Sequence, residues 1–212
     1  SVDVRQHEGK GPKQQQEAPH AHSVLLDDNN RFAFVNDLGT DKVVIYEFDQ
    51  NTGKLSPNAA QPFYKARPGA GPRHFKIHPN RRFGFIVNEL DMTVTSLRFD
   101  AELGKLSEVQ TLSTLPTGYT GANSCADIHV SPDGNFLYVS NRGHDSIVSY
   151  RIDPKAGSLQ FIEHVPTGGK TPRNFVIDPT GSYLLAANQR SDSIVVFAID
   201  RDTGKLSAAG QS

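Results

Sequence analysis

One pattern of apolar and polar residues occurs four times along the chain. Each copy holds two short apolar runs separated by a polar turn, then a third apolar run, a turn with glycine, and a Leu-Ser or Leu-Gln pair. The runs are rich in Val, Ile, Phe and Tyr without a sustained helical period, which is typical of β-strands. The first two runs of the four copies span residues 22–36, 74–88, 127–141 and 174–188. The pattern therefore predicts four copies of a four-stranded β unit.

Tandem four-stranded units of this length are typical of a β-propeller, in which each unit forms one blade. We predict an all-β fold, a β-propeller of four-stranded blades, with about four blades in a single domain over residues 1–212. The blade units run over about 1–56, 57–107, 108–160 and 161–212. The first residues match the fourth-strand position of a preceding unit, which favours an arc of a larger ring. The open edge strands of such an arc predict self-association.

The charge of the chain is nearly balanced, with 22 Lys and Arg against 23 Asp and Glu and a net charge of −1. This balance argues against a nucleic-acid or membrane-surface partner that is held by bulk charge. No apolar run approaches the ~20 residues that a membrane span needs. The single cysteine, Cys125, cannot form a disulfide within the chain, which fits a reducing compartment. We therefore predict a soluble, cytoplasmic protein that is a piece of a longer one.

Comparison of the four copies separates architectural positions from candidate functional ones. A residue type that every copy shares indicates a structural role, and this applies to Asn36, Asn88, Asn141 and Asn188. Polar positions that differ between copies lie at the start of the first run and directly after the Asn. Because strand directions alternate within a blade, these two places meet at one mouth of the channel. The predicted ring of side chains comprises His20, His22, Arg73, His74, Glu89, Asp127, Arg142, Arg173 and Gln189.

This set suits an anionic small molecule, since it contains three arginines, several histidines and at least two carboxylates. A metal site is an alternative interpretation, because His20 and His22 alternate on one strand face, as do Asp127 and His129. The spacing dictates no third ligand, and we predict no metal and no cofactor.

Several of these residues also have structural interpretations. Glu89 could pair with Arg73 across the strands, and Arg142 and Arg173 could form ion pairs between blades. Cys125 has no activating base in the sequence, so a small buried residue is the better interpretation.

Segments from all four copies resemble the lactonase family of seven-bladed β-propellers. They are PHAHS (19–23), GPRHFKIHP (71–79) with VNE (87–89), ADIHVSPDGNFLYVSNRG (126–143) and PRNFVIDPTGSYLLAANQ (172–189). The family includes bacterial 6-phosphogluconolactonase and the fungal 3-carboxy-cis,cis-muconate lactonizing enzyme. The resemblance covers nearly the whole chain and implies about four blades of a seven-bladed ring.

The resemblance also implies a cofactor-free reaction at a lactone. Glu89 would be the acid or base with His20 or His22 beside it, and arginines would hold the anion of the substrate. The predicted catalytic residues are Glu89, His20, His22 and Arg73. The predicted substrate-binding residues are His74, Asp127, Arg142, Arg173 and Gln189.

Three functions remain open at this point. The leading prediction is a lactone-acting enzyme of the 6-phosphogluconolactonase type, which hydrolyses a sugar-phosphate lactone. The alternatives are a cycloisomerase that acts on a carboxymuconate, and a non-catalytic propeller that serves as an interaction scaffold. Hydrolysis needs a base for the attacking water and stabilisation of an oxyanion, whereas lactonization needs a proton donor. The same residue types serve both reactions, so the sequence leaves the choice open.

Overall fold

The chain folds into four antiparallel β-sheets, one for each copy of the sequence pattern. The computed structural model describes residues 2–209. Each sheet is one blade, and its strands pair in chain order. A 3-10 turn, η1 (Gln14–Gln16), precedes the first blade. Within residues 2–209, no helix is long and apolar enough to cross a membrane.

The strands have the following bounds. Blade 1 comprises β1 (Ala21–Leu26), β2 (Phe32–Asp37), β3 (Lys42–Asp49), β4 (Lys54–Pro57) and β5 (Phe63–Lys65). Blade 2 comprises β6 (Pro72–Ile77), β7 (Phe83–Asn88), β8 (Thr93–Asp100) and β9 (Lys105–Ser113). Blade 3 comprises β10 (Ser124–Val130), β11 (Phe136–Arg142), β12 (Ser146–Ile152) and β13 (Leu159–Pro166). Blade 4 comprises β14 (Pro172–Ile177), β15 (Tyr183–Asn188), β16 (Ser193–Ile199) and β17 (Leu206–Ala208).

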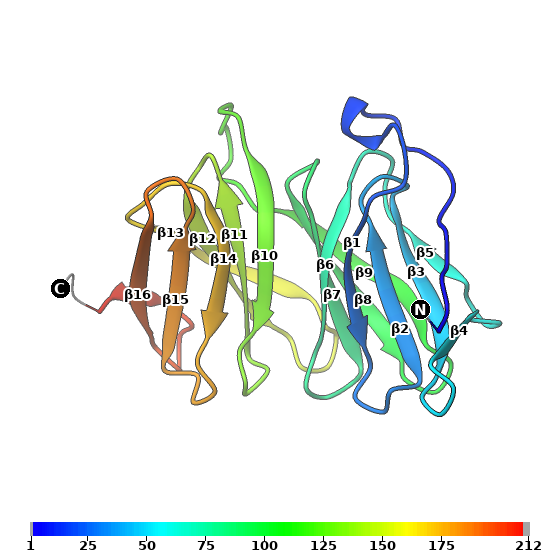
Figure 1. Ribbon diagram of the computed structural model, residues 1–212. Coiled ribbons are helices and arrows are strands. Elements are labelled where there is room, and N and C mark those ends of the chain that lie inside the picture. The colour runs from blue at the N-terminus through cyan, green and yellow to red at the C-terminus, as the bar shows by residue number, and fades with distance from the viewer. Residues whose placement is uncertain (1, 210–212) are drawn as a thin grey trace.

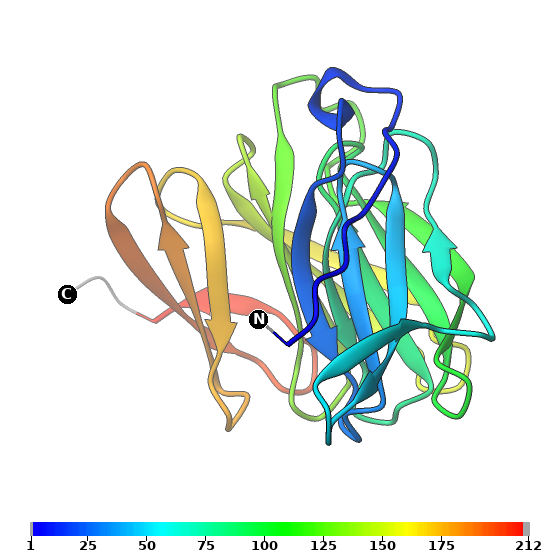
Figure 2. The same ribbon diagram turned by 45° about the vertical axis from the view of Figure 1, so that its right-hand side comes forward.

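The blades stand side by side in an arc, with blade 1 and blade 4 at its two ends (Figures 1 and 2). The first strand of each blade contacts the first strand of the next, from β1 through β6 and β10 to β14. These four strands therefore form the inner wall of the arc, as the first strands of propeller blades do around a channel. The predicted all-β propeller arc is confirmed.

The fourth strands extend beyond the boundaries of the repeat units drawn from the sequence. Strand β9 continues past residue 107 to Ser113, and β13 continues past residue 160 to Pro166. These additional residues pair with the third strand of the same blade. In blade 1 the corresponding strand is interrupted, and β4 and β5 both pair with β3.

Hydrophobic cores lie between neighbouring blades. The core between blades 1 and 2 includes Phe34 and Phe75, whose ring centroids lie 5.2 Å apart. Similar cores join blade 2 to blade 3 and blade 3 to blade 4. Every residue of β7 is buried, because blade 2 has a neighbouring sheet on both faces. This two-sided burial explains why the strand sequences are nearly continuous apolar runs.

Repeated glycines allow the blades to approach closely at the outer rim. Gly157 precedes the fourth strand of blade 3 with a φ of 74° and packs against Phe83, the first residue of β7 in blade 2. A Cβ at Gly157 would lie 2.3 Å from the Phe83 ring. Gly204 of blade 4 repeats this contact with Phe136 of blade 3. The glycine of the repeat is therefore required both by its backbone conformation and by the neighbouring aromatic ring.

Strand pairing corrects the alignment of the first repeat by one residue. Asp37 pairs with Lys42, as Asn88 pairs with Thr93 in blade 2. Asp37, and not Asn36, therefore holds the position of the repeated asparagine. The same shift makes His22 the counterpart of Arg73.

The face of blade 4 that points away from blade 3 is apolar. Val176, Leu185 and Val196 are neighbours across its strands, and Tyr183 and Ile194 share their face. The side chain of Ile194 is 70% exposed, and that of Tyr183 is 48% exposed. Counterparts of Tyr183 in the other blades, such as Phe83, are buried beneath the next blade.

Gly157→Ala is expected to destabilise the fold more than Gly118→Ala does. Both glycines have a positive φ, but a Cβ at Gly118 has no heavy atom within 4 Å, whereas at Gly157 it meets Phe83. The difference isolates overpacking, which costs about 1–3 kcal/mol in the free energy of unfolding. Urea denaturation followed by circular dichroism measures both variants. Equal losses would show that the contact with Phe83 does not constrain this turn.

Self-association through the apolar face of blade 4 is the second expectation from the fold. Light scattering over a range of protein concentrations should show dimers or larger species, because an exposed apolar sheet face gains free energy on burial. Ile194→Ser should weaken this association, whereas Leu103→Ser, at an exposed leucine on a turn of blade 2, should not. A monodisperse monomer at all concentrations would refute this expectation.

Candidate functional site

A β-bulge near the start of every first strand places the candidate residues. The register shifts between Ala21 and Ser23 in β1, and at corresponding places in β6, β10 and β14. The bulged segments contain His22, Arg73, Asp127 and Arg173. A bulge bends its strand and redirects a side chain. These four residues consequently face the same end of the inner wall, although they come from four blades.

Glu89 joins two arginines behind this wall. Its Oε2 atom accepts a hydrogen bond of 2.8 Å from Nε of Arg73, and its Oε1 atom lies 2.7 Å from Nη2 of Arg142. The Arg73 side chain is 3% exposed, and Nη1 donates to the carbonyl oxygen of Ala126. Nη2 of Arg142 also donates to the carbonyl oxygen of Cys125, at 2.8 Å. The two guanidinium groups are therefore held rigidly, and both oxygens of the carboxylate are occupied.

Asp127 is the centre of a second network. Its Oδ1 atom lies 2.7 Å from Nδ1 of His74, and its Oδ2 atom accepts a hydrogen bond of 2.6 Å from the side chain of Asn174. Nε2 of His129 lies 3.3 Å from the same Oδ2 atom. Burial opposes the charge of this carboxylate, but hydrogen bonds with His129 and His74 outweigh burial and hold the pKa of Asp127 well below its usual value. Asp127 is therefore ionised and can only accept hydrogen bonds.

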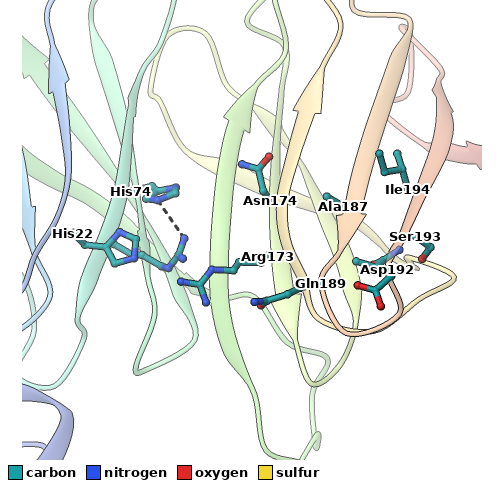
Figure 3. Close-up of a pocket in the computed structure, with 11 residues that line it drawn as sticks. His22, His74, Arg173, Asn174, Ala187, Gln189, Asp192, Ser193 and Ile194 are labelled. Atoms are coloured by element: carbon teal, nitrogen blue, oxygen red, sulfur yellow. Dashed lines mark hydrogen bonds between the residues drawn. The ribbon is translucent and has the colours of Figure 1, made fainter.

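A pocket of about 500 Å³ opens at this end of the inner wall. One side is lined by His22, Arg73, His74, Arg173 and Gln189. Figure 3 shows His22, His74, Arg173 and Gln189 around a common space. The other side is formed by the end of blade 4, including Asp192 and Ile194. A volume of this size accommodates a small-molecule ligand.

Histidine and arginine lie together on the basic side of the pocket. The rings of His22 and His74 have centroids 5.1 Å apart, and Nη1 of Arg73 lies 3.2 Å from Nε2 of His74. His22 is open to solvent on one side, yet partial burial and the charge of Arg73 lower the pKa of its imidazole to about 4. His22 is consequently neutral at physiological pH, and the arginines supply the positive charge.

The structure brings together most of the residues that the sequence singled out. His22, Arg73, His74, Arg173 and Gln189 line the pocket. Glu89, Arg142 and Asp127 are not part of this lining, but Glu89 pairs with Arg73 and Arg142, and Asp127 contacts His74. The predicted pair of Glu89 with Arg73 is confirmed as a contact.

His20 is the exception among the predicted residues. It lies before β1 with an exposed side chain, outside the pocket lining. Its backbone N–H donates to Oδ1 of Asp37 at 2.9 Å, so the residue anchors the start of blade 1. The structure does not bring His20 to this pocket, because the bulge between Ala21 and Ser23 lies at His22, and a role of His20 in the reaction stays a prediction.

The sequence did not reveal the part of the pocket around Asp192, before the third strand of blade 4. Asp192 precedes the third strand with a φ of 48°, and Asp41 and Asp145 hold the same place in blades 1 and 3 with φ values of 56° and 51°. Asp41 accepts a hydrogen bond of 2.8 Å from the N–H of Gly71, and Asp145 accepts one of 2.8 Å from the N–H of Thr171. In both cases the donor leads into the next blade. The repeated aspartate was visible in the sequence, but its inter-blade role was not.

The metal and thiol alternatives do not match the geometry. Between residues 2 and 209, no group of three His, Cys, Asp or Glu side chains is arranged to hold a metal ion. Asp127 and His129, which share a strand face, are joined by a hydrogen bond. Burial raises the pKa of the Cys125 thiol to about 12, so this side chain is an uncharged part of the core.

Sequence comparisons connect the chain to known lactonases. The chain is 38% identical to 6-phosphogluconolactonase from Bacillus subtilis (strain 168) over 170 residues, which cover 80% of this chain and 47% of that protein. It is 40% identical to 6-phosphogluconolactonase from Pectobacterium carotovorum over 154 residues, or 73% of this chain and 46% of that protein. The chain therefore spans about half the length of the curated relatives it matches. The cycloisomerase alternative finds no support in these names.

A structural comparison agrees with these relatives. The periplasmic gluconolactonase of Pseudomonas aeruginosa superimposes with a TM-score of 0.93 and 34% sequence identity, over 99% of this chain and 58% of that one. The cytoplasmic location stays a prediction. The family model described as "Lactonase, 7-bladed beta-propeller" matches residues 1–212. The chain belongs to the lactonase family of seven-bladed β-propellers.

Proposed function

We propose that this chain carries the substrate pocket of a lactone hydrolase that acts on a sugar-phosphate lactone of the 6-phosphogluconolactone type. The names of its relatives support lactone chemistry. The single observation that supports a phosphorylated substrate is the state of Arg173. This guanidinium lines the pocket, and its side chain makes no ion pair with any of residues 2–209.

The charges around the pocket are consistent with an anionic ligand. Arg73 and Arg142 share the carboxylate of Glu89, so part of their charge is already compensated. Arg173 adds a further cation to the same wall of the pocket, which Gln189 also lines (Figure 3). A planar guanidinium binds two oxygens of a phosphate through two parallel hydrogen bonds. Arg173 is thus suited to hold the phosphate, while Arg73 faces the reacting end.

Hydrolysis of a lactone requires two catalytic groups from the protein. A base must take a proton from water as the water attacks the carbonyl carbon, and a donor must stabilise the oxyanion that forms. Arg73 is suited to the second role, since its buried side chain is preorganised by Glu89 and points to the pocket. Neutral His22 can donate or accept a hydrogen bond on the same side.

Arg173→Gln should raise the KM for 6-phosphogluconolactone about tenfold, because a hydrogen bond with a charged group contributes about 1.5–3 kcal/mol. The KM for unphosphorylated gluconolactone should change little. Both are measured as hydrolysis above the spontaneous rate. Arg190→Gln is the matched control, since Arg190 is an exposed arginine of the adjacent turn that does not line the pocket. Equal effects of Arg173→Gln on both lactones would contradict a phosphate role.

His22 should titrate with a pKa of about 4 in an NMR experiment, well below the ordinary value of 6.5. Because the folded state disfavours protonated His22, its contribution to stability is complete above pH 6.5 and is lost as the pH falls toward 4. Binding of 6-phosphogluconate should move this pKa upward, since a nearby anion favours the imidazolium. His22→Gln identifies the signal. Titration near 6.5 would show that burial and the charge of Arg73 do not lower the pKa of His22. An unchanged pKa in the presence of the anion would show that the anion does not bind beside His22.

A further inference from the structure

A buried carboxylate holds one imidazole at the edge of the pocket. Asp127 is 3% exposed in its side chain, and its Oδ1 atom lies 2.7 Å from Nδ1 of His74. The His74 side chain is 24% exposed and lines the pocket of about 500 Å³. The same carboxylate is fixed from blade 4 by Asn174, and Oδ1 also accepts the N–H of Ile128 at 2.9 Å. Asp127 therefore has little freedom to turn away from His74.

Both neighbours of His74 require the same tautomer. An ionised Asp127 can only accept, so Nδ1 of His74 must carry the hydrogen of that bond. Nη1 of Arg73 can only donate, so Nε2 of His74 must present its lone pair at the 3.2 Å contact. Nη1 of Arg73 also donates to the carbonyl oxygen of Ala126. Arg73 therefore keeps a hydrogen-bond partner when Nε2 of His74 accepts a hydrogen from another donor. The basic nitrogen thus lies on the pocket side of the ring.

Other candidate bases are less suited to this task. Glu89 has an arginine on each oxygen, at 2.8 and 2.7 Å, and it does not line the pocket. His22 lines the pocket, but within residues 2–209 no carboxylate orients its ring, and its low pKa makes it a weak base. His74 alone combines a place in the pocket with an aspartate that fixes its tautomer. An imidazole that is oriented by a carboxylate is a recurring arrangement for general-base catalysis.

We infer that His74 is the general base of the proposed reaction and that Asp127 is its positioning residue. The inference rests on the proposed lactone hydrolysis. Nε2 takes a proton from water as the water oxygen bonds to the carbonyl carbon, and Arg73 stabilises the oxyanion. When the ring carbon–oxygen bond breaks, the proton passes from Nε2 to the leaving oxygen. One lactone and one water give one hydroxy acid, and Asp127 stays ionised throughout.

His74→Gln tests the catalytic role through kcat. General-base catalysis contributes about 10²–10⁴-fold, so kcat should fall by at least about 100-fold with a small change in KM. His164→Gln is the matched control, because His164 lies on β13 outside the pocket, and its kcat should stay near that of the unmodified chain. His74→Asn is a second variant, and circular dichroism confirms that each protein is folded. A folded His74→Gln chain with unchanged kcat would overturn the assignment while the proposed function stands.

Nitrogen-15 NMR tests the positioning role without any turnover. His74 should show the Nδ1–H tautomer, and Asp127→Asn should reduce that form and lower kcat. His74 in the Nε2–H tautomer in the unmodified chain would overturn the inference, whatever the assay gives. An unmodified chain that hydrolyses neither 6-phosphogluconolactone nor gluconolactone would instead reject the proposed function and, with it, the base role.

Discussion

The buried carboxylate of Asp127 constrains three blades at once. It stands on β10 and accepts hydrogen bonds from His74 on β6 and from Asn174 on β14. An unpaired carboxylate at this depth would cost several kcal/mol, so the folded state requires both neighbours at hydrogen-bond distance. The first strands are thereby held in register from blade to blade. Residues on the same strands, Arg73 and Arg173 among them, consequently keep fixed places around the pocket although no single sheet contains them.

Local charge, and not the charge of the whole chain, decides which ligand the pocket suits. The chain has a net charge of −1, yet one wall of the pocket combines two arginines with two histidines. Glu89 compensates Arg73 and Arg142 from behind, where it also fixes their geometry. The partial burial that keeps His22 neutral limits the repulsion among these groups. An anion that enters the pocket therefore meets oriented donors that need little rearrangement, which is the condition for strong electrostatic stabilisation.

The repeat pattern was sufficient to predict the blades, because strands that are buried on both faces must be apolar along their length. The mouth of the channel also followed from the sequence, since alternating strand directions allow few arrangements. The register of blade 1 did not follow, because Asn36 and Asp37 are adjacent polar residues and only strand pairing distinguishes them. The placement of His20 beside His22 in the predicted site follows from the same ambiguity. Bulges and inter-blade contacts have no local sequence signature here, so neither the separation of His20 from His22 nor the pocket wall at Asp192 could be predicted.

The pocket and the open end of the arc share one surface. Asp41 and Asp145 each bind the backbone that leads into the following blade, at Gly71 and Thr171. Asp192 has the same backbone conformation but lines the pocket, together with the exposed Ile194. The matched region covers 47% of the Bacillus subtilis relative and 58% of the Pseudomonas aeruginosa structure. A further blade on this face would cover the apolar strands and reshape the wall opposite the arginines. The end of blade 4 therefore belongs both to the pocket wall and to the exposed apolar face, whereas the two contacts that set the tautomer of His74 come from Arg73 in blade 2 and Asp127 in blade 3.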